Sequence, residues 1–130
     1  MIDKVDLWNN FVSYGVDKLE EFYTLDDGGK QAVVLYNLYS NCQSGDGWEY
    51  FFDEMKYYKI SFDDVESIVN NIGAEELFEN FKAARLFYEA NGFDGDYSEV
   101  DEFFTNYGDE IEKICVSFID GHVYLFEDVE

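Results

Sequence analysis

Apolar side chains recur every three or four residues along most of this chain, and no other feature constrains its fold as strongly. Residues at that spacing share one face of an α-helix, so each such segment is expected to bury one side. The sequence contains no proline, which would interrupt helices, and glycine marks the breaks instead. The pattern predicts an all-α fold of about six or seven helices in a single domain, residues 1–130.

Two helix starts carry a sequence signature. Ser61 and Asp64 have the spacing of an N-terminal capping pair, and Ser98 with Asp101 repeats it. The expected helices are 3–24, a buried central helix over 32–39, 48–58, 61–73, 74–90, one from Ser98 and a last one from about Asp109.

The last of these segments has an alternative interpretation. Residues 114–118 and 123–126 flank Asp120-Gly121 and would suit a short C-terminal β-hairpin. Apolar residues from Ile111 to His122, however, keep three-and-four spacing over twelve residues, which favours a helix. We therefore expect the helix.

The interior must be filled mainly by aromatic side chains, because the chain has thirteen Phe, eleven Tyr and two Trp. Cys42 and Cys115 belong to no close Cys or His pair, so they are predicted to be buried free thiols. The N-terminal residues lack the basic segment and apolar run of a secretory signal, and no stretch approaches membrane-spanning length. A cytoplasmic protein is expected.

Charge is the outlying property of the composition. Thirty acidic side chains against eight basic ones give a formal net charge of −22. A small soluble domain needs a net charge of magnitude only about 2–8, and further like charge destabilises the compact state. The same field disfavours direct contact with nucleic acid or an anionic membrane. A basic protein partner is therefore expected.

The acidic residues are concentrated in the C-terminal third, where residues 89–130 hold thirteen acids and one base, Lys113. Acids three or four apart on a helix lie about 5–6 Å from one another, a spacing of the same order as that of phosphates in nucleic acid. Phe103 and Phe104 are either aromatic anchors for a partner or core residues. The predicted partner-binding residues are Asp94, Asp96, Tyr97, Glu99, Asp101, Glu102, Tyr107, Asp109, Glu110 and Glu112.

Catalysis is not expected, because the chain has one histidine, His122, and no motif that pairs a nucleophile with a base. Residues 94–98 resemble the start of a calcium-binding loop. That loop would need glycine at its sixth position and an acid at its twelfth, where this chain has Glu99 and Thr105. A turn leading into a capped helix is the preferred interpretation, and neither a metal nor another cofactor is predicted.

One part of the chain resembles a known family. The residues that carry the resemblance are Leu35–Tyr39, Gly45–Phe52, Ile68, the step Ile72-Gly73-Ala74, and the alanines at 83 and 84. Over about residues 30–105 they are similar to the DMP19-like family of helical DNA mimics, although Asp46 separates the two glycines of the family's turn. The resemblance implies an all-helical fold and an acidic surface that occupies the site of a DNA-binding protein.

Three hypotheses follow. The leading one is a non-catalytic inhibitor that fills the nucleic-acid-binding site of a basic protein, either as a DNA mimic or as the immunity protein of a nuclease toxin. The alternative is a calcium- or substrate-binding enzyme domain that uses acidic ligands. A third is adaptation to high salt, in which the acids serve solvation alone.

Overall fold

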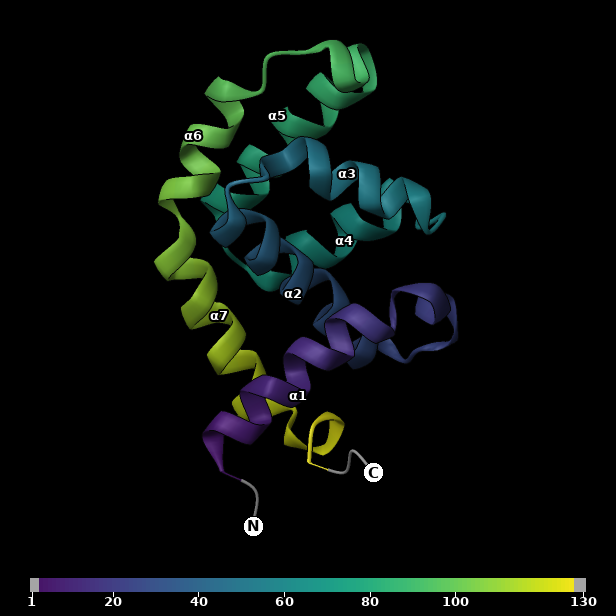
Figure 1. Ribbon diagram of the computed structural model, residues 1–130, viewed down its shortest axis with the longest axis vertical. Coiled ribbons are helices and arrows are strands. Elements are labelled where there is room, and N and C mark those ends of the chain that lie inside the picture. The colour runs from purple at the N-terminus through teal and green to yellow at the C-terminus, as the bar shows by residue number, and fades with distance from the viewer. Residues whose placement is uncertain (1–2, 128–130) are drawn as a thin grey trace.

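The computed structural model describes residues 3–127, which form seven α-helices and three short 3₁₀ helices, with no strand among them (Figure 1). The α-helices are α1 (Lys4–Asp17), α2 (Asp27–Ser44), α3 (Gly47–Tyr57), α4 (Phe62–Ile72), α5 (Glu75–Asn91), α6 (Ser98–Asn106) and α7 (Gly108–Gly121). The 3₁₀ helices are η1 (Leu19–Thr24), η2 (Gly92–Asp94) and η3 (Val123–Leu125). The prediction of an all-α fold with six or seven helices is confirmed.

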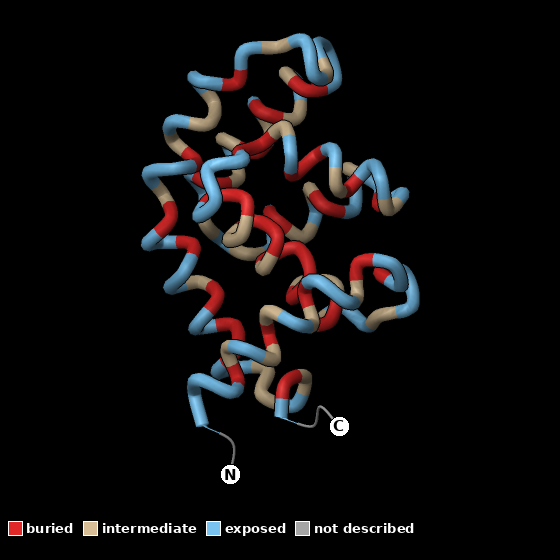
Figure 2. Tube along the Cα trace, in the orientation of Figure 1, coloured by how far each residue is buried: buried red, intermediate tan, exposed pale blue. Residues whose placement is uncertain are grey.

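Helix α2 lies at the centre of the molecule and packs against α1, α3, α4 and α7. Its residues Ala32–Leu35 and Leu38 are fully buried, so this helix is apolar around most of its circumference, as a central helix must be. Figure 2 shows the buried segments gathered around it. The predicted central helix over 32–39 is therefore confirmed, with bounds that extend further at both ends.

The first predicted helix, 3–24, is wrong in its second half. The chain leaves the α-helix after Asp17 and continues as the 3₁₀ helix η1. In a 3₁₀ helix residues three apart lie on the same side, and Leu19 and Phe22 are both buried there. The tighter turn thus lets this segment bury both apolar side chains.

The C-terminal segment is helical and not a hairpin, so the helix predicted from about Asp109 is confirmed. After α7 the chain turns through η3 and brings the buried Phe126 against Phe11 of α1, with ring centres 5.6 Å apart. The Asn10 side chain donates a hydrogen bond to the Phe126 carbonyl at 2.6 Å. This contact fixes α7 against α1.

An aromatic cluster joins α3, α5 and α6. The buried Trp48 ring stacks on Phe104, with ring centres 4.0 Å apart, and meets Phe81 edge-on. The indole N–H of Trp48 donates to the Asn80 side chain at 2.7 Å, and Asn80 donates in turn to the Val100 carbonyl at 3.1 Å. These contacts hold α6 in place against the core, so the acids on α6 are presented by a fixed helix.

Both cysteines are buried free thiols, as predicted. Burial raises the pKa of Cys115 to about 12, which keeps this thiol protonated. Within residues 3–127, no helix combines the length and the apolar character needed to cross a membrane.

Candidate protein-binding surface

Helices α6 and α7 follow one another along one side of the molecule (Figure 1), and exposed segments recur along that side (Figure 2). We define the α6–α7 edge as five exposed carboxylates, those of Glu99, Glu102, Asp109, Glu110 and Glu112. Asp94 and Asp96 are exposed as well, but they precede α6 in the chain. Seven of the ten predicted partner-binding residues are therefore exposed, Asp101 and Tyr107 are half-buried, and Tyr97 is buried.

Cations are nearly absent from this edge. Lys113 is the one basic residue of α6 and α7, and it pairs with Glu110 at 3.4 Å. In the part of the chain that the structure describes, the other four edge carboxylates form no ion pair. Glu112 accepts one hydrogen bond, from the Tyr39 hydroxyl at 3.5 Å. No cation offsets the negative charge of these four carboxylates, so that charge is directed to solvent or to a partner.

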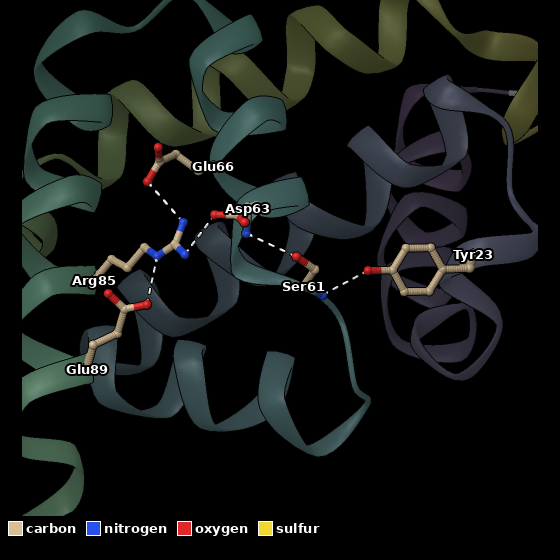
Figure 3. Close-up of polar contacts among 6 residues, drawn as sticks. All are labelled: Tyr23, Ser61, Asp63, Glu66, Arg85 and Glu89. Carbon is tan, nitrogen blue, oxygen red and sulfur yellow. Dashed lines mark hydrogen bonds and ion pairs between the residues drawn. The ribbon is translucent and has the colours of Figure 1, made fainter.

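The acids of α4 and α5 are treated differently, because Arg85 of α5 gathers three of them (Figure 3). Its guanidinium lies 2.8 Å from Asp63, 3.2 Å from Glu66 and 3.1 Å from Glu89. The Arg85 side chain is only 18% exposed, so these interactions are screened less than those of a fully exposed cation. Part of the carboxylate charge is therefore offset within the fold.

The N-terminus of α4 is also tied to the rest of the molecule (Figure 3). The hydroxyl of Tyr23 in η1 accepts a hydrogen bond from the Ser61 N–H at 2.8 Å. The same hydroxyl donates to Asp64 at 2.7 Å. Ser61 caps the helix, as predicted, through its side-chain oxygen and the N–H of Asp63. The predicted reciprocal bond with Asp64 is not formed, because the Ser61 N–H donates to Tyr23 instead. Another acid of α4 is thereby held by a partner within the chain.

Asp101, a predicted partner-binding residue, serves the fold instead. Its carboxylate accepts a hydrogen bond from the Trp48 N–H at 2.9 Å and so caps α3 from a helix more than fifty residues away. Gly47 has a φ of 76°, and a Cβ there would clash with this carboxylate. Burial raises the pKa of Asp101, although the hydrogen bond from Trp48 opposes the shift. Asp101 is therefore not free to meet a partner.

The four aromatic candidates divide into two pairs. Tyr97 is only 6% exposed and packs against Phe87, and Phe104 is fully buried, so both are core residues and the role predicted for Tyr97 is wrong. Phe103 and Tyr107 are half-buried and stack at 5.0 Å. The pKa of Tyr107 is raised, first by burial and then by the nearby charges of Glu76 and Glu110. This stacked pair lies within the acidic field and stays accessible.

The loop before α6 forms a helix cap. The Asp96 carboxylate accepts hydrogen bonds from the N–H and the hydroxyl of Ser98, at 3.0 and 2.6 Å, and these bonds lower its pKa. The predicted cap at Ser98 is wrong, because the helix begins at Ser98 itself and its N-cap residue is Tyr97, which makes no side-chain cap hydrogen bond. Asp96 instead accepts from the first N–H of the helix. Among residues 3–127 no group of three or more His, Cys, Asp or Glu side chains is arranged to hold a metal ion.

His122 also has a structural environment. Its Nδ1 atom lies 2.9 Å from the Phe118 carbonyl oxygen, and its ring stacks on Phe118 with centres 4.0 Å apart. These contacts use one ring nitrogen and one ring face to close the C-terminal end of α7.

The structure also has a groove that was not predicted from the sequence. We call it the α2–α3 groove; it opens between these helices beside the end of α1 and has a volume of about 560 Å³. Its side chains include Tyr36, Asn37 and Asn41 of α2 with Tyr50, Glu54 and Tyr57 of α3. One sequence feature could have predicted this groove. Tyr50, Glu54 and Tyr57 are spaced so that they share one face of a helix. That face lies opposite the buried face of α3, which consists of Trp48, Phe51, Phe52 and Met55.

Of the three carboxylates that line the α2–α3 groove, two accept a hydrogen bond from a hydroxyl. Asp53 accepts one from the Tyr88 hydroxyl at 2.6 Å, and Asp46 accepts one from the Ser44 hydroxyl at 2.9 Å. Burial raises the pKa of Glu54, and a hydrogen bond with the Asn41 side chain opposes that shift. Within the described residues no hydroxyl and no cation contacts Glu54, so it is the groove carboxylate most open to a cationic ligand.

Comparison with models of known protein families, with curated proteins and with solved structures finds no match to this chain. The resemblance to the DMP19-like family therefore stays a prediction from the residues that carry it. The functional argument rests on the geometry and charge of the two surfaces.

Proposed function

We propose that this protein is a non-catalytic inhibitor that covers the nucleic-acid-binding surface of a basic protein. The observation that carries the proposal is the α6–α7 edge, where five exposed carboxylates are accompanied by one cation, Lys113. Proteins bind nucleic acid largely through Lys and Arg side chains that neutralise phosphates. A fixed row of carboxylates offers those side chains the same sign of charge.

The length of helices α6 and α7 matches a short stretch of nucleic acid, but their charge density is lower. At 1.5 Å per residue, the 9 residues of α6 and 14 of α7 make about 35 Å of helix, which matches roughly ten nucleotides of one strand. Five carboxylates over that length give about half the charge of such a strand. Charge alone therefore favours fast encounter more than tight binding.

An aromatic anchor is needed for slow dissociation, and the stacked pair Phe103 and Tyr107 fits that role. Tyrosine is enriched among residues that dominate binding energy, especially where surrounding contacts exclude water. The pair lies half-buried at the junction of α6 and α7, with Glu76 and Glu110 near Tyr107. Burial of these rings against a basic surface would supply the apolar area that the carboxylates lack.

Affinity capture from cells of the source organism tests the proposal. The wild-type bait is compared with an edge variant, Glu102→Gln/Asp109→Asn/Glu112→Gln, and with a control, Asp6→Asn/Asp27→Asn/Glu127→Gln, which removes three exposed charges elsewhere. We expect the wild type and the control to retain a basic nucleic-acid-binding protein or nuclease at low salt. The edge variant should retain less of that protein, because the loss of electrostatic steering slows its association.

The captured protein is then mixed with its nucleic acid, and displacement of that nucleic acid by the wild type is the expected result. Recovery of no such protein, or equal capture by the edge variant, would contradict the proposal. A toxin gene beside the gene of this protein would identify an immunity protein, whereas a nucleic-acid-binding partner without toxic activity would identify a mimic.

A further inference from the structure

We propose that the α2–α3 groove receives an arginine side chain of the basic partner, which makes it a second contact apart from the α6–α7 edge. The inference rests on the proposed function for the source of the arginine. The chemistry of the groove is argued from its own residues.

Two buried amides give the groove a wall of hydrogen-bond acceptors. Asn37 is 3% exposed and donates both amide hydrogens, to the Gly15 carbonyl at 3.3 Å and the Val33 carbonyl at 2.8 Å. Its side-chain oxygen accepts no hydrogen bond from residues 3–127. Every fully buried polar side-chain atom there has a partner, so this oxygen is not completely enclosed, and Asn37 lines the groove. A ligand that donates hydrogen bonds would satisfy it.

Asn41 continues this wall one helical turn further along α2. It is 8% exposed and donates to the Asn37 backbone carbonyl at 2.8 Å, which fixes its orientation. Its side-chain oxygen likewise accepts no hydrogen bond from any residue that the structure describes. The groove therefore presents two amide oxygens held in place by the helix to which they belong.

Glu54 adds the negative charge. It forms no ion pair with the described part of the chain, and no Lys or Arg lines the groove. Leaving a half-buried carboxylate without a cation is unfavourable, as the raised pKa of Glu54 indicates. A cationic group beside Glu54 would remove that cost and would meet no other cation in the groove.

Tyrosine rings complete the site. Tyr36 lies in the groove, while Tyr50 and Tyr57, which are 59% and 79% exposed, stand at its rim without cover from the rest of the chain. A guanidinium has five N–H donors, no acceptor, and a flat face that stacks on aromatic rings. A lysine ammonium lacks the flat face and is more strongly hydrated, so arginine fits this lining better.

The protein already binds one guanidinium in this manner. Arg85 contacts three carboxylates, and its guanidinium carbon lies 5.7 Å from the centre of the Phe62 ring. The α2–α3 groove offers the same two elements, a carboxylate and aromatic rings, with no arginine of its own. Its volume of about 560 Å³ exceeds what one side chain fills, which leaves room for the backbone that carries it.

A titration followed by amide NMR of the labelled full chain tests the inference. The probe is the tripeptide Gly-Arg-Gly with capped ends, compared with Gly-Lys-Gly and Gly-Gly-Gly at constant ionic strength. We expect saturable shifts at the side-chain amides of Asn37 and Asn41 with the arginine peptide, at least threefold weaker binding of the lysine peptide and none of Gly-Gly-Gly.

Two substitutions in the groove and one control substitution outside it define the site. Glu54→Gln keeps the shape of the side chain and should weaken the arginine peptide about tenfold, and Tyr57→Ser should weaken it about threefold. Tyr124→Ser removes another exposed tyrosine, outside the groove, and should leave the affinity unchanged. Unaltered spectra away from each substitution establish that the variants are folded.

The outcomes separate this inference from the proposed function. Shifts confined to the α6–α7 edge would overturn the arginine site and leave the inhibitor proposal standing. Groove shifts that depend on protein concentration without peptide would show that a second copy of the chain covers the groove, which also overturns the inference. Specific arginine binding in the groove would uphold the inference even if capture yields no nucleic-acid-binding protein.

Discussion

Helices α4 and α5 and the α6–α7 edge both carry closely spaced acids, yet their charges have different fates. On α4 and α5 a single guanidinium, that of Arg85, lies within 3.2 Å of Asp63, Glu66 and Glu89. Along the edge Lys113 reaches one carboxylate, at 3.4 Å, from a side chain that is far more exposed. The net charge of −22 is therefore not equally available to a partner everywhere: the fold offsets part of the charge of one group of acids and leaves the other group exposed.

The acids affect the stability of the fold in opposite directions in helices α4 and α5 and along the α6–α7 edge. Each exposed ion pair contributes about 0–1 kcal/mol, so a partly buried network of three stabilises the α4–α5 pair modestly. Unpaired acids three or four apart repel one another by about 0.2–0.5 kcal/mol for each pair. The α6–α7 edge therefore lowers stability slightly, and the aromatic cluster around Trp48 compensates by holding α6.

Replacing Arg85 should have the largest effect on this contrast. Arg85→Met keeps much of the apolar volume over Phe62 but leaves three carboxylates unneutralised. We expect the free energy of unfolding in urea to fall by about 2 kcal/mol at low salt, and the loss to shrink in 1 M NaCl. Lys82→Met is the matched control on α5, where one exposed pair at 2.7 Å should be worth no more than about 0.5 kcal/mol. Equal losses in the two variants would break the comparison.

Asp101 tests whether an acid near the edge can belong to the fold. Asp101→Ala should cost about 1 kcal/mol of unfolding free energy, because the Trp48 N–H loses its cap, whereas Asp101→Asn keeps an acceptor and should cost little. Exposed Glu102→Ala, one residue away, serves as the control. If Asp101→Asn were as costly as Asp101→Ala, the charge and not the cap would be responsible.

The difference in unfolding free energy between the wild type and Asp101→Asn should change with pH in a defined direction. Burial raises the folded-state pKa of Asp101 above its unfolded value, so the folded protein binds a proton more readily. The wild type should therefore gain stability relative to Asp101→Asn as the pH falls toward the ordinary aspartate pKa of 3.8. Urea titrations of both proteins between neutral pH and this range measure the difference, and a change in the opposite direction would show that the hydrogen bond from Trp48 outweighs burial.

The smallest expected effect comes from the edge itself. Glu102→Gln/Glu112→Gln removes one charge from α6 and one from α7. The helix dipole favours acids in the first turn of a helix, and both residues lie beyond that turn, so they gain little from it. We expect the melting temperature to rise by about 1–2 °C at low salt and the gain to vanish in 1 M NaCl. A loss of stability would show that the hydrogen bond from the Tyr39 hydroxyl to Glu112, at 3.5 Å, outweighs the repulsion between the edge acids.

Local pattern was sufficient to predict most of the helices. Apolar spacing and the glycines at positions 45 and 73, both with positive φ, set where α2, α3 and α4 begin or end, because these features act within one or two turns of chain. The break at Lys18 was missed, since it depends on burying Leu19 and Phe22 against elements that are distant in sequence. The exposure of the edge acids could be predicted in the same way, because the spacing of apolar residues also determines which helix face is left to solvent.

The sequence by itself thus determined an all-α chain, its buried thiols and its acidic surplus, all of which follow from composition and helical period. Only the tertiary structure decided which acids are free. It placed Asp101 on the N-terminus of α3, gathered three carboxylates around Arg85, buried Tyr97 and set Glu54 between tyrosines. The physical reason is that a side chain's charge is neutralised, shielded or exposed by neighbours that packing supplies, and these neighbours lie up to fifty residues or more away in the chain.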